Sequence, residues 1–172
     1  VTRVARKYFG FRDGPKMKVF EVDGRVYVKR AIREGKKYDA ILLDAFDHEY
    51  IPEHLLTREY LTEVKSLLTP GGVLVANTFS SSRLYDHEST TYASVYGSFF
   101  NLKRENRVIV ARPAGLPDAG AIRQKALEYG LALQSFGVDS QSLLPLFSTR
   151  ADWDGNARVL TDQYSPANLL NR

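Results

Sequence analysis

Three features of the sequence predict an α/β fold, with a mostly parallel sheet flanked by helices in a single domain over residues 1–172. The chain is long enough to bury one hydrophobic core. Helical and strand patterns alternate from Val1 to Ala76, which is typical of a doubly wound sheet with right-handed crossovers. Residues 40–43 form an apolar run without alternation, so we expect this strand to be buried on both faces.

The first quarter of the chain predicts, in order, a helix over Val1–Phe9, a short strand over Lys18–Val22, a helix over Arg25–Glu34 and a strand over Ala40–Leu43. The first helix follows from an apolar stripe at i, i+3, i+4 spacing. Asp23 and Gly24 form a turn that ends the first strand, and Gly35 closes the second helix. Because the chain opens at Val1 within a helical pattern, we expect a fragment or mature piece of a longer protein.

The remaining elements are expected with decreasing regularity along the chain. Thr57 is a suitable N-cap for a helix whose apolar face carries Tyr60, Leu61, Val64, Leu67 and Leu68. The Thr-Pro-Gly-Gly segment at 69–72 ends that helix. We then expect a strand over Val73–Ala76, a helix over Tyr92–Phe100, a strand over Arg107–Ala111, a helix over Ala119–Phe136 and a tail from Ser140 without a clear period.

Composition excludes several classes of protein. The chain has no cysteine, which excludes disulfide frameworks, thiolate nucleophiles and zinc ribbons. Its net charge is +4, but the basic residues are spread, and the densest stretch, Lys29–Lys37, is a solvated helix face without aromatic stacking residues. No apolar run is long enough to span a membrane. We therefore expect a cytoplasmic protein with no nucleic-acid or membrane partner.

Polar side chains follow each of the three expected strands, where ligands bind in open α/β sheets. They are Asp23-Gly24, then Asp44 with Asp47, then Asn77. A carboxylate at such a position can also cap the following helix. The Asp44/Asp47 pair suits general acid/base chemistry, the holding of a cation, or a divalent metal if Glu49 and Glu53 add oxygen ligands. We expect the loop from Ala45 to Leu56 to order on ligand binding, unless Pro52 pins it permanently.

An ordered set of motifs resembles the spermidine synthase (polyamine aminopropyltransferase) family. Tyr38–Asp47 is similar to its "YD-x-I-x-x-D-x-x-D" signature, Val22–Arg25 to its "DGR" turn, and Leu68–Val75 to its "L-x-P-G-G" segment. Val159–Pro166 resembles the "TDDYAP" ending of the bacterial spermidine-synthase-like branch. Many S-adenosylmethionine-dependent methyltransferases share single pieces of this set, whereas the ordered set is more specific.

The resemblance implies a Rossmann-like fold of the class I methyltransferase type and a transferase of polyamine biosynthesis. Such an enzyme moves an aminopropyl group from decarboxylated S-adenosylmethionine to putrescine or a related amine, without a metal. Carried over by motif, Asp23 and Gly24 lie at the adenine side of the nucleoside, and Asp44 deprotonates the attacking amine. Asp47 holds the far ammonium of the diamine, and Asn77 stands where the best-known members carry a glutamine.

The sequence departs from the family pattern in two respects. The typical loop reads "D-S-S-D-P-x-G-P", whereas residues 44–52 keep both aspartates but not the serines or the Gly-Pro turn. The family's N-terminal half, with the glycine-rich turn and the ribose-binding acid, has no counterpart here. We therefore do not expect this chain to be active by itself, and we expect a homodimer through an uncovered sheet edge. The alternatives are a small-molecule methyltransferase using S-adenosylmethionine and a non-catalytic domain that retains only the fold.

Overall fold

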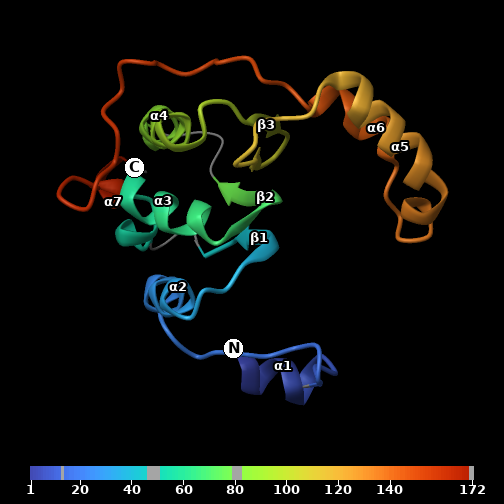
Figure 1. Cartoon of the computed structure of the whole chain (residues 1–172), viewed down its shortest axis with the longest axis horizontal. Helices are drawn as coiled ribbons and strands as arrows, with labels where there is room; N and C mark the ends of the chain where they lie inside the picture. The colour runs from blue at the N-terminus through green and yellow to red at the C-terminus, as the bar shows by residue number, and fades with distance from the viewer. Residues whose placement is uncertain (13, 46–50, 79–82, 171–172) are drawn as a thin grey trace.

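The computed structural model describes residues 1–12, 14–45, 51–78 and 83–170, and its centre is a mixed sheet (Figure 1). The strand order is β1-β2-β4-β3, with bounds β1 (Tyr38–Leu43), β2 (Leu68–Thr78), β3 (Phe100–Lys103) and β4 (Arg107–Ala111). β1 and β2 are parallel, whereas β4 runs antiparallel to both β2 and β3. The α/β class is confirmed. In the described residues the predicted parallel pair, β1 and β2, is extended by two strands, β4 and β3, that pair in the antiparallel sense.

The helices are α1 (Thr2–Tyr8), α2 (Gly24–Arg33), η1 (Glu53–Leu55), α3 (Arg58–Ser66), α4 (Leu84–Tyr96), α5 (Ala119–Gln134), α6 (Ser140–Leu143), η2 (Leu144–Leu146) and α7 (Ala167–Leu170). Figure 1 shows α2, α3 and α4 stacked one above another beside the sheet. α1 and the α5–α6 hairpin project from this body. Within the described ranges, none of the helices has the length and apolar character needed to cross a membrane.

Local signals position the two helices that precede β1 and β2. The carboxylate of Asp23 accepts hydrogen bonds from the backbone N–H groups of Arg25 and Val26 at the start of α2. The Thr57 hydroxyl accepts one from the Tyr60 N–H at the start of α3, as predicted. The apolar face predicted for α3 is buried against the sheet, with Tyr60, Leu61, Val64, Leu67 and Leu68 in the main core. The spacing of apolar residues therefore identified this helix and its buried face.

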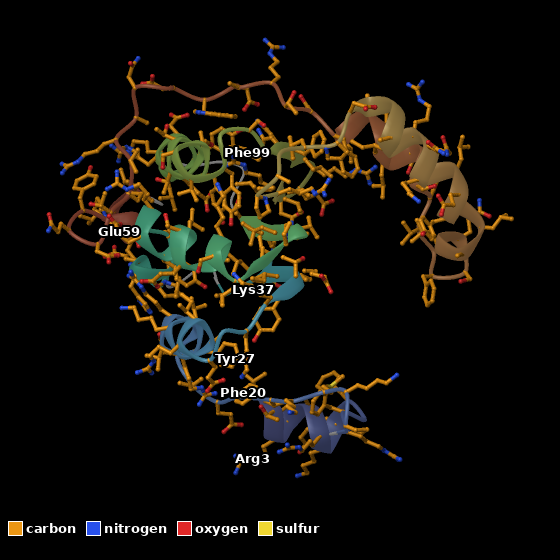
Figure 2. The ribbon with its side chains drawn as sticks, viewed as in Figure 1. Arg3, Phe20, Tyr27, Lys37, Glu59 and Phe99 are labelled. Atoms are coloured by element: carbon orange, nitrogen blue, oxygen red, sulfur yellow. The ribbon has the colours of Figure 1, made fainter. Side chains whose placement is uncertain are left out.

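The prediction of a strand over Lys18–Val22 is wrong for this structure, in which the segment is irregular. A strand needs a neighbour to accept its backbone hydrogen bonds, and none of the described strands pairs with it. Phe20 instead lays its ring on Tyr27 of α2, with ring centroids 4.9 Å apart (Figure 2). The Phe20 side chain thus makes its contact with a helix rather than within a sheet.

The expected burial of β1 on both faces is also wrong. Ala40 is exposed and Leu42 keeps 72% of its surface accessible. β1 lies at the edge of the described sheet, and the helix layer covers one face only. Along β2 and β4 buried residues accordingly alternate with half-exposed ones. One face of β1 and one of its hydrogen-bonding edges are therefore without a partner in the described part of the chain.

The Thr-Pro-Gly-Gly segment has a second role beyond ending α3. Its residues form the first part of β2, and the register with β1 shifts between Tyr38 and Ala40. Gly72 is buried there, and a Cβ at this position would lie 3.0 Å from the Tyr38 carbonyl oxygen and 3.1 Å from the Thr69 backbone. Any larger residue at 72 would push the two strands apart, so glycine permits the close approach.

The helices and strands of the second half of the chain agree with the predicted elements in part. β4 has the predicted bounds, Arg107–Ala111, and α5 begins at the predicted Ala119. The helix expected over Tyr92–Phe100 lies earlier, over Leu84–Tyr96, because its buried positions include polar residues that the apolar pattern does not show. Most of the apolar side chains of α5 are exposed, including Leu127, Tyr129 and Leu131.

A buried polar network joins α4 to the antiparallel half of the sheet. Arg107 is fully buried and donates to the Asn101 amide oxygen at 2.8 Å and the Ser89 hydroxyl at 2.7 Å. Its guanidinium also lies 3.4 Å from a carboxylate oxygen of Glu88 and over the Tyr85 ring at 4.2 Å. Burial raises the pKa of Glu88 to about 7, although the Arg107 charge opposes this rise.

We expect the free energy of unfolding to fall as pH rises from 4.5 to about 7, and Glu88→Gln to remove this fall. The unfolded chain ionises Glu88 near its ordinary pKa of 4.5, whereas the folded state holds the proton until about pH 7. The contribution of Glu88 to stability is therefore fully present below pH 4.5 and is lost as the proton leaves, because the folded state binds more protons in this window. Urea titrations across the window measure the slope.

Glu34→Gln is the control for this prediction. The pKa of Glu34 is lowered by its hydrogen bond with Lys36, so its replacement cannot remove a loss of stability above pH 4.5. An equal slope in Glu88→Gln and in the unsubstituted protein would show that Glu88 ionises without cost in the folded state.

Candidate functional site

The parallel pairing of β1 and β2 brings Asp44 and Asn77 together. Leu43 is opposite Ala76 in the register, so the next residues along each strand are neighbours. The Asn77 side-chain amide donates a hydrogen bond to a carboxylate oxygen of Asp44 at 3.0 Å. The Asn77 side-chain oxygen in turn accepts a short hydrogen bond from the side-chain amide of Asn106, a residue in the turn between β3 and β4. Asn106 therefore orients Asn77 so that its N–H points at Asp44.

Asp23 lies in a second cluster, at the N-terminus of α2. One carboxylate oxygen accepts from two backbone N–H groups at 3.0 and 3.1 Å, and the other lies 2.7 Å from His54 Nε2. These contacts hold the pKa of Asp23 below its usual value, with the hydrogen bond to His54 as the largest cause. The Asp23 side chain remains 43% exposed, and its second oxygen has room for a further donor.

Gly24 is the first residue of α2, and a Cβ there would meet only Leu55 at 3.8 Å, which is ordinary contact. The packing of the protein itself therefore does not require glycine at this position. Asp23 is thus the residue of this pair whose side chain offers chemistry, and Gly24 contributes its backbone at the helix start.

Arg25 connects this second cluster to α3 and to the C-terminal part of the chain through hydrogen bonds. Its guanidinium bonds both carboxylate oxygens of Asp162 at 2.6 and 2.8 Å and both of Glu63 at 3.1 and 3.2 Å. It also donates to the His54 carbonyl oxygen at 3.3 Å. Arg25, His54, Thr57 and Asp162 contribute to an open hollow of about 810 Å³, whose further wall is formed by Glu53 and residues 163–166.

Asp47 lies outside the described residues. The part of the loop after it, from Ile51 to Leu56, is packed against the body: Ile51, Leu55 and Leu56 are buried. This packing of residues 51–56, which form η1 and its flanks, favours the alternative of a permanently packed connection, and the expected ordering on ligand binding stays a prediction. Glu53, considered above as a metal ligand, instead accepts hydrogen bonds from Asn168.

Both clusters lie at the carboxyl edge of the sheet. α2 and α3 each run back from this edge to the start of the next strand, so their N-termini lie near the ends of β1 and β2. Across the described ranges, no three His, Asp or Glu side chains are close enough together to hold a metal ion. The edge thus presents carboxylates and amides suited to hydrogen bonding and to cationic ligands.

Sequence reasoning missed His54, Arg25, Asp162 and Asn106. Asn106 could have been found had β4 been predicted antiparallel to β2, since its start would then lie beside the end of β2. Asp162 belongs to the C-terminal motif, but nothing in the spacing indicates that it reaches Arg25, 137 residues earlier.

Comparison with known proteins places this geometry in a family. Residues 1–112 match the family model described as "Spermine/spermidine synthase domain". The polyamine aminopropyltransferase of Vibrio vulnificus is 53% identical over 99% of this chain, and a probable polyamine aminopropyl transferase of Bifidobacterium longum is 31% identical over 99%. The chain spans 58% of the length of the first relative and 41% of the second.

Two solved structures share the fold. A probable spermidine synthase from Corynebacterium glutamicum superposes with a TM-score of 0.59 at 20% identity, covering 91% of this chain and 61% of its own. Human methyltransferase-like protein 13 in complex with SAH gives a TM-score of 0.61 at 21% identity, covering 90% and 70%. The Rossmann-like fold predicted from the motifs is confirmed by these likenesses. With the family model matched over residues 1–112, this chain belongs to the spermine/spermidine synthase family.

Proposed function

We propose that the protein containing this chain is an aminopropyltransferase of polyamine biosynthesis. It would transfer the aminopropyl group of decarboxylated S-adenosylmethionine to putrescine or a related amine. The observation that carries the proposal is the hydrogen bond from Asn77 to Asp44 at the carboxyl edge of β1 and β2. Family membership and relatives named polyamine aminopropyltransferase support the same reaction over a small-molecule methyltransferase or a non-catalytic domain.

The proposed step requires a base. A primary amine resembles a lysine side chain, which is protonated at neutral pH with a pKa of about 10.4. Asp44 accepts the amine's proton, and the freed nitrogen forms a bond to the aminopropyl carbon next to the sulfonium. The bond from that carbon to sulfur breaks and its electron pair stays on sulfur, which leaves the thioether methylthioadenosine and an extended amine. Asn77 holds the Asp44 carboxylate in place for this transfer.

The donor, decarboxylated S-adenosylmethionine, would bind at the cluster formed by Asp23 and His54. Asp23 is ionised, since its pKa is lowered, and its exposed oxygen can accept a hydrogen bond from the adenine amino group. Carboxylates at the edge also favour the positive sulfonium. No metal takes part in this proposal. Isothermal titration of the protein with decarboxylated and with intact S-adenosylmethionine tests donor identity, and tighter binding of the intact form would contradict aminopropyl transfer.

The proposal includes a small-molecule amine as the other substrate, a cytoplasmic location and a homodimer. The uncovered edge of β1 and its exposed Leu42 support association through this side of the sheet. Light scattering of residues 1–172 and of the protein expressed from its complete coding sequence tests the dimer, and a monomer at micromolar concentration in both would contradict it.

Asp44→Asn should lower kcat by about 10²–10⁴-fold while leaving donor affinity nearly unchanged. Asparagine keeps the size of the side chain but cannot take the amine's proton. The measurement is steady-state kinetics with decarboxylated S-adenosylmethionine and putrescine, using the complete coding sequence.

Asp39→Asn is the matched control, because Asp39 lies at the opposite end of the same strand and bonds only Thr69 among the contacts described for it. Turnover close to that of the unsubstituted enzyme in Asp44→Asn would remove the catalytic assignment. In that case Asp44 would act only through contacts that asparagine reproduces.

Asp47→Asn should raise the KM for the amine with a smaller effect on kcat. The proposed role of Asp47 is to bind the distant ammonium, an interaction present in the ground state and the transition state alike. The comparison of putrescine with a monoamine of equal length is informative, since the monoamine lacks that ammonium. A KM for the monoamine that rises as much as the KM for putrescine would contradict this role.

Asn77→Leu should lower kcat by about ten- to a hundred-fold, because a hydrogen bond to a charged group is worth roughly 1.5–3 kcal/mol. Leucine has the same number and branching of side-chain heavy atoms but no N–H to orient Asp44. Asn77→Gln keeps the amide and should recover a large part of the activity. Equal loss in both variants would show that packing, rather than the hydrogen bond to Asp44, is what position 77 supplies.

A further inference from the structure

The C-terminal segment Leu160–Leu170 returns to the body of the protein after the α5–α6 hairpin. Figure 1 shows it beside α3, far from the hairpin that precedes it. Leu160 and Ala167 are fully buried in a small second core with Ile51, Leu56 and Leu84. This core joins the end of the chain to the loop after β1 and to α4, so the segment is an integral part of the fold.

Asp162 makes the strongest polar contacts of the segment. Its carboxylate accepts two hydrogen bonds from Arg25 and one from the Thr57 hydroxyl at 2.7 Å. Its backbone N–H donates to a carboxylate oxygen of Glu59 at 3.0 Å, and Figure 2 shows Glu59 next to this segment. Hydrogen bonds from Arg25 and Thr57 hold the pKa of Asp162 below 3.8, so the group is a carboxylate at neutral pH.

Asn168, near the end of the C-terminal segment, binds the loop after β1 at Ile51. Its side-chain oxygen accepts from the Ile51 N–H and its amide donates to the Ile51 carbonyl, both at 3.0 Å. This two-way contact resembles the pairing of one strand residue with another. Ser165 adds a hydrogen bond to the Glu53 carbonyl oxygen at 3.0 Å. The backbone on both sides of Pro52 is therefore bound by side chains from the C-terminal segment.

These contacts converge on His54. Its imidazole is 45% exposed, so packing alone does not fix its position. Its backbone is held by η1, by Arg25 through the carbonyl oxygen, and by the neighbouring Glu53 through Ser165. Asp162 fixes Arg25 in turn. The imidazole of His54, 2.7 Å from Asp23, is thus placed by residues more than a hundred positions away in the sequence.

We propose that the C-terminal segment Leu160–Leu170 is a positioning element of the donor site. Asp162, acting through Arg25, and Asn168, acting through Ile51, hold His54 against Asp23 and so set the direction of the exposed Asp23 oxygen. This inference rests on the proposed function, in which Asp23 binds the nucleoside. It adds that affinity for the nucleoside depends on the C-terminal segment, whereas binding of the amine at the Asp44 cluster does not.

The test compares two variants, Asp162→Asn and Asn168→Ala, in the protein expressed from its complete coding sequence. Methylthioadenosine is the probe, titrated by calorimetry, and steady-state kinetics supply the KM for putrescine. Each variant should weaken methylthioadenosine binding by about ten-fold, since charge-assisted or paired hydrogen bonds are lost. The KM for putrescine should stay within about two-fold, because the amine site is not changed. A general loss of folded protein would instead lower the calorimetric stoichiometry and the apparent kcat, without weakening the affinity of the remaining protein for methylthioadenosine.

Asp154→Asn is the matched control from the same tail. Its carboxylate bonds only the N–H groups of Asn156 among the contacts described for it, so nucleoside affinity should be unchanged. Hydrogen exchange of residues 51–55 gives a second readout, faster in Asp162→Asn and Asn168→Ala but not in Asp154→Asn. Unchanged exchange and unchanged methylthioadenosine affinity in both test variants would overturn the inference.

Asp23→Ala separates this inference from the proposed function. If Asp23→Ala weakens methylthioadenosine binding and the two tail variants do not, the donor site stands and the positioning role fails. If Asp23→Ala leaves binding unchanged, the assignment of the donor site fails, and the positioning role fails with it.

Discussion

The shared guanidinium of Arg25 is the interaction on which the arrangement of the candidate site depends. This side chain is 10% exposed and contacts two carboxylates from different parts of the chain, Glu63 of α3 and Asp162 of the C-terminal segment. Burying an arginine is costly unless its N–H groups are satisfied, and both oxygens of each carboxylate take part here. Removing one carboxylate would leave a buried charge partly unpaired, so the geometry is strongly specified.

This constraint links local and long-range structure. Arg25 is the second residue of α2, so its position is fixed by the helix that Asp23 caps. The same side chain then fixes the His54 carbonyl and the C-terminal segment. The loop after β1 is consequently held from two directions, by α2 and by the end of the chain. A segment without regular period is thereby packed against the body over residues 51–56.

The sequence could predict those parts of the fold that depend on near neighbours. The helix beginning at Thr57, the strand ending at Asp44 and the strand over Arg107–Ala111 each carry their own spacing or capping signal. The proximity of Asp44 to Asn77 also followed, because parallel neighbouring strands end at the same edge. The prediction failed where the structure of a segment depends on a neighbouring strand. Lys18–Val22 has the composition of a strand, but no described strand lies beside it, and Phe20 packs on α2 instead.

The candidate site shows the same division. Carboxylates at strand ends can be found from the strands alone, whereas the residues that orient them come from elements with no fixed spacing to the strand: Asn106 from a hairpin turn and Asp162 from the tail. A likeness in fold to a methyltransferase-like structure shows that the sheet itself does not determine the reaction. The chemistry of this chain must therefore reside in the loops at the carboxyl edge. Since those loops are held by contacts between distant residues, a change in the C-terminal segment can alter the site without touching a strand.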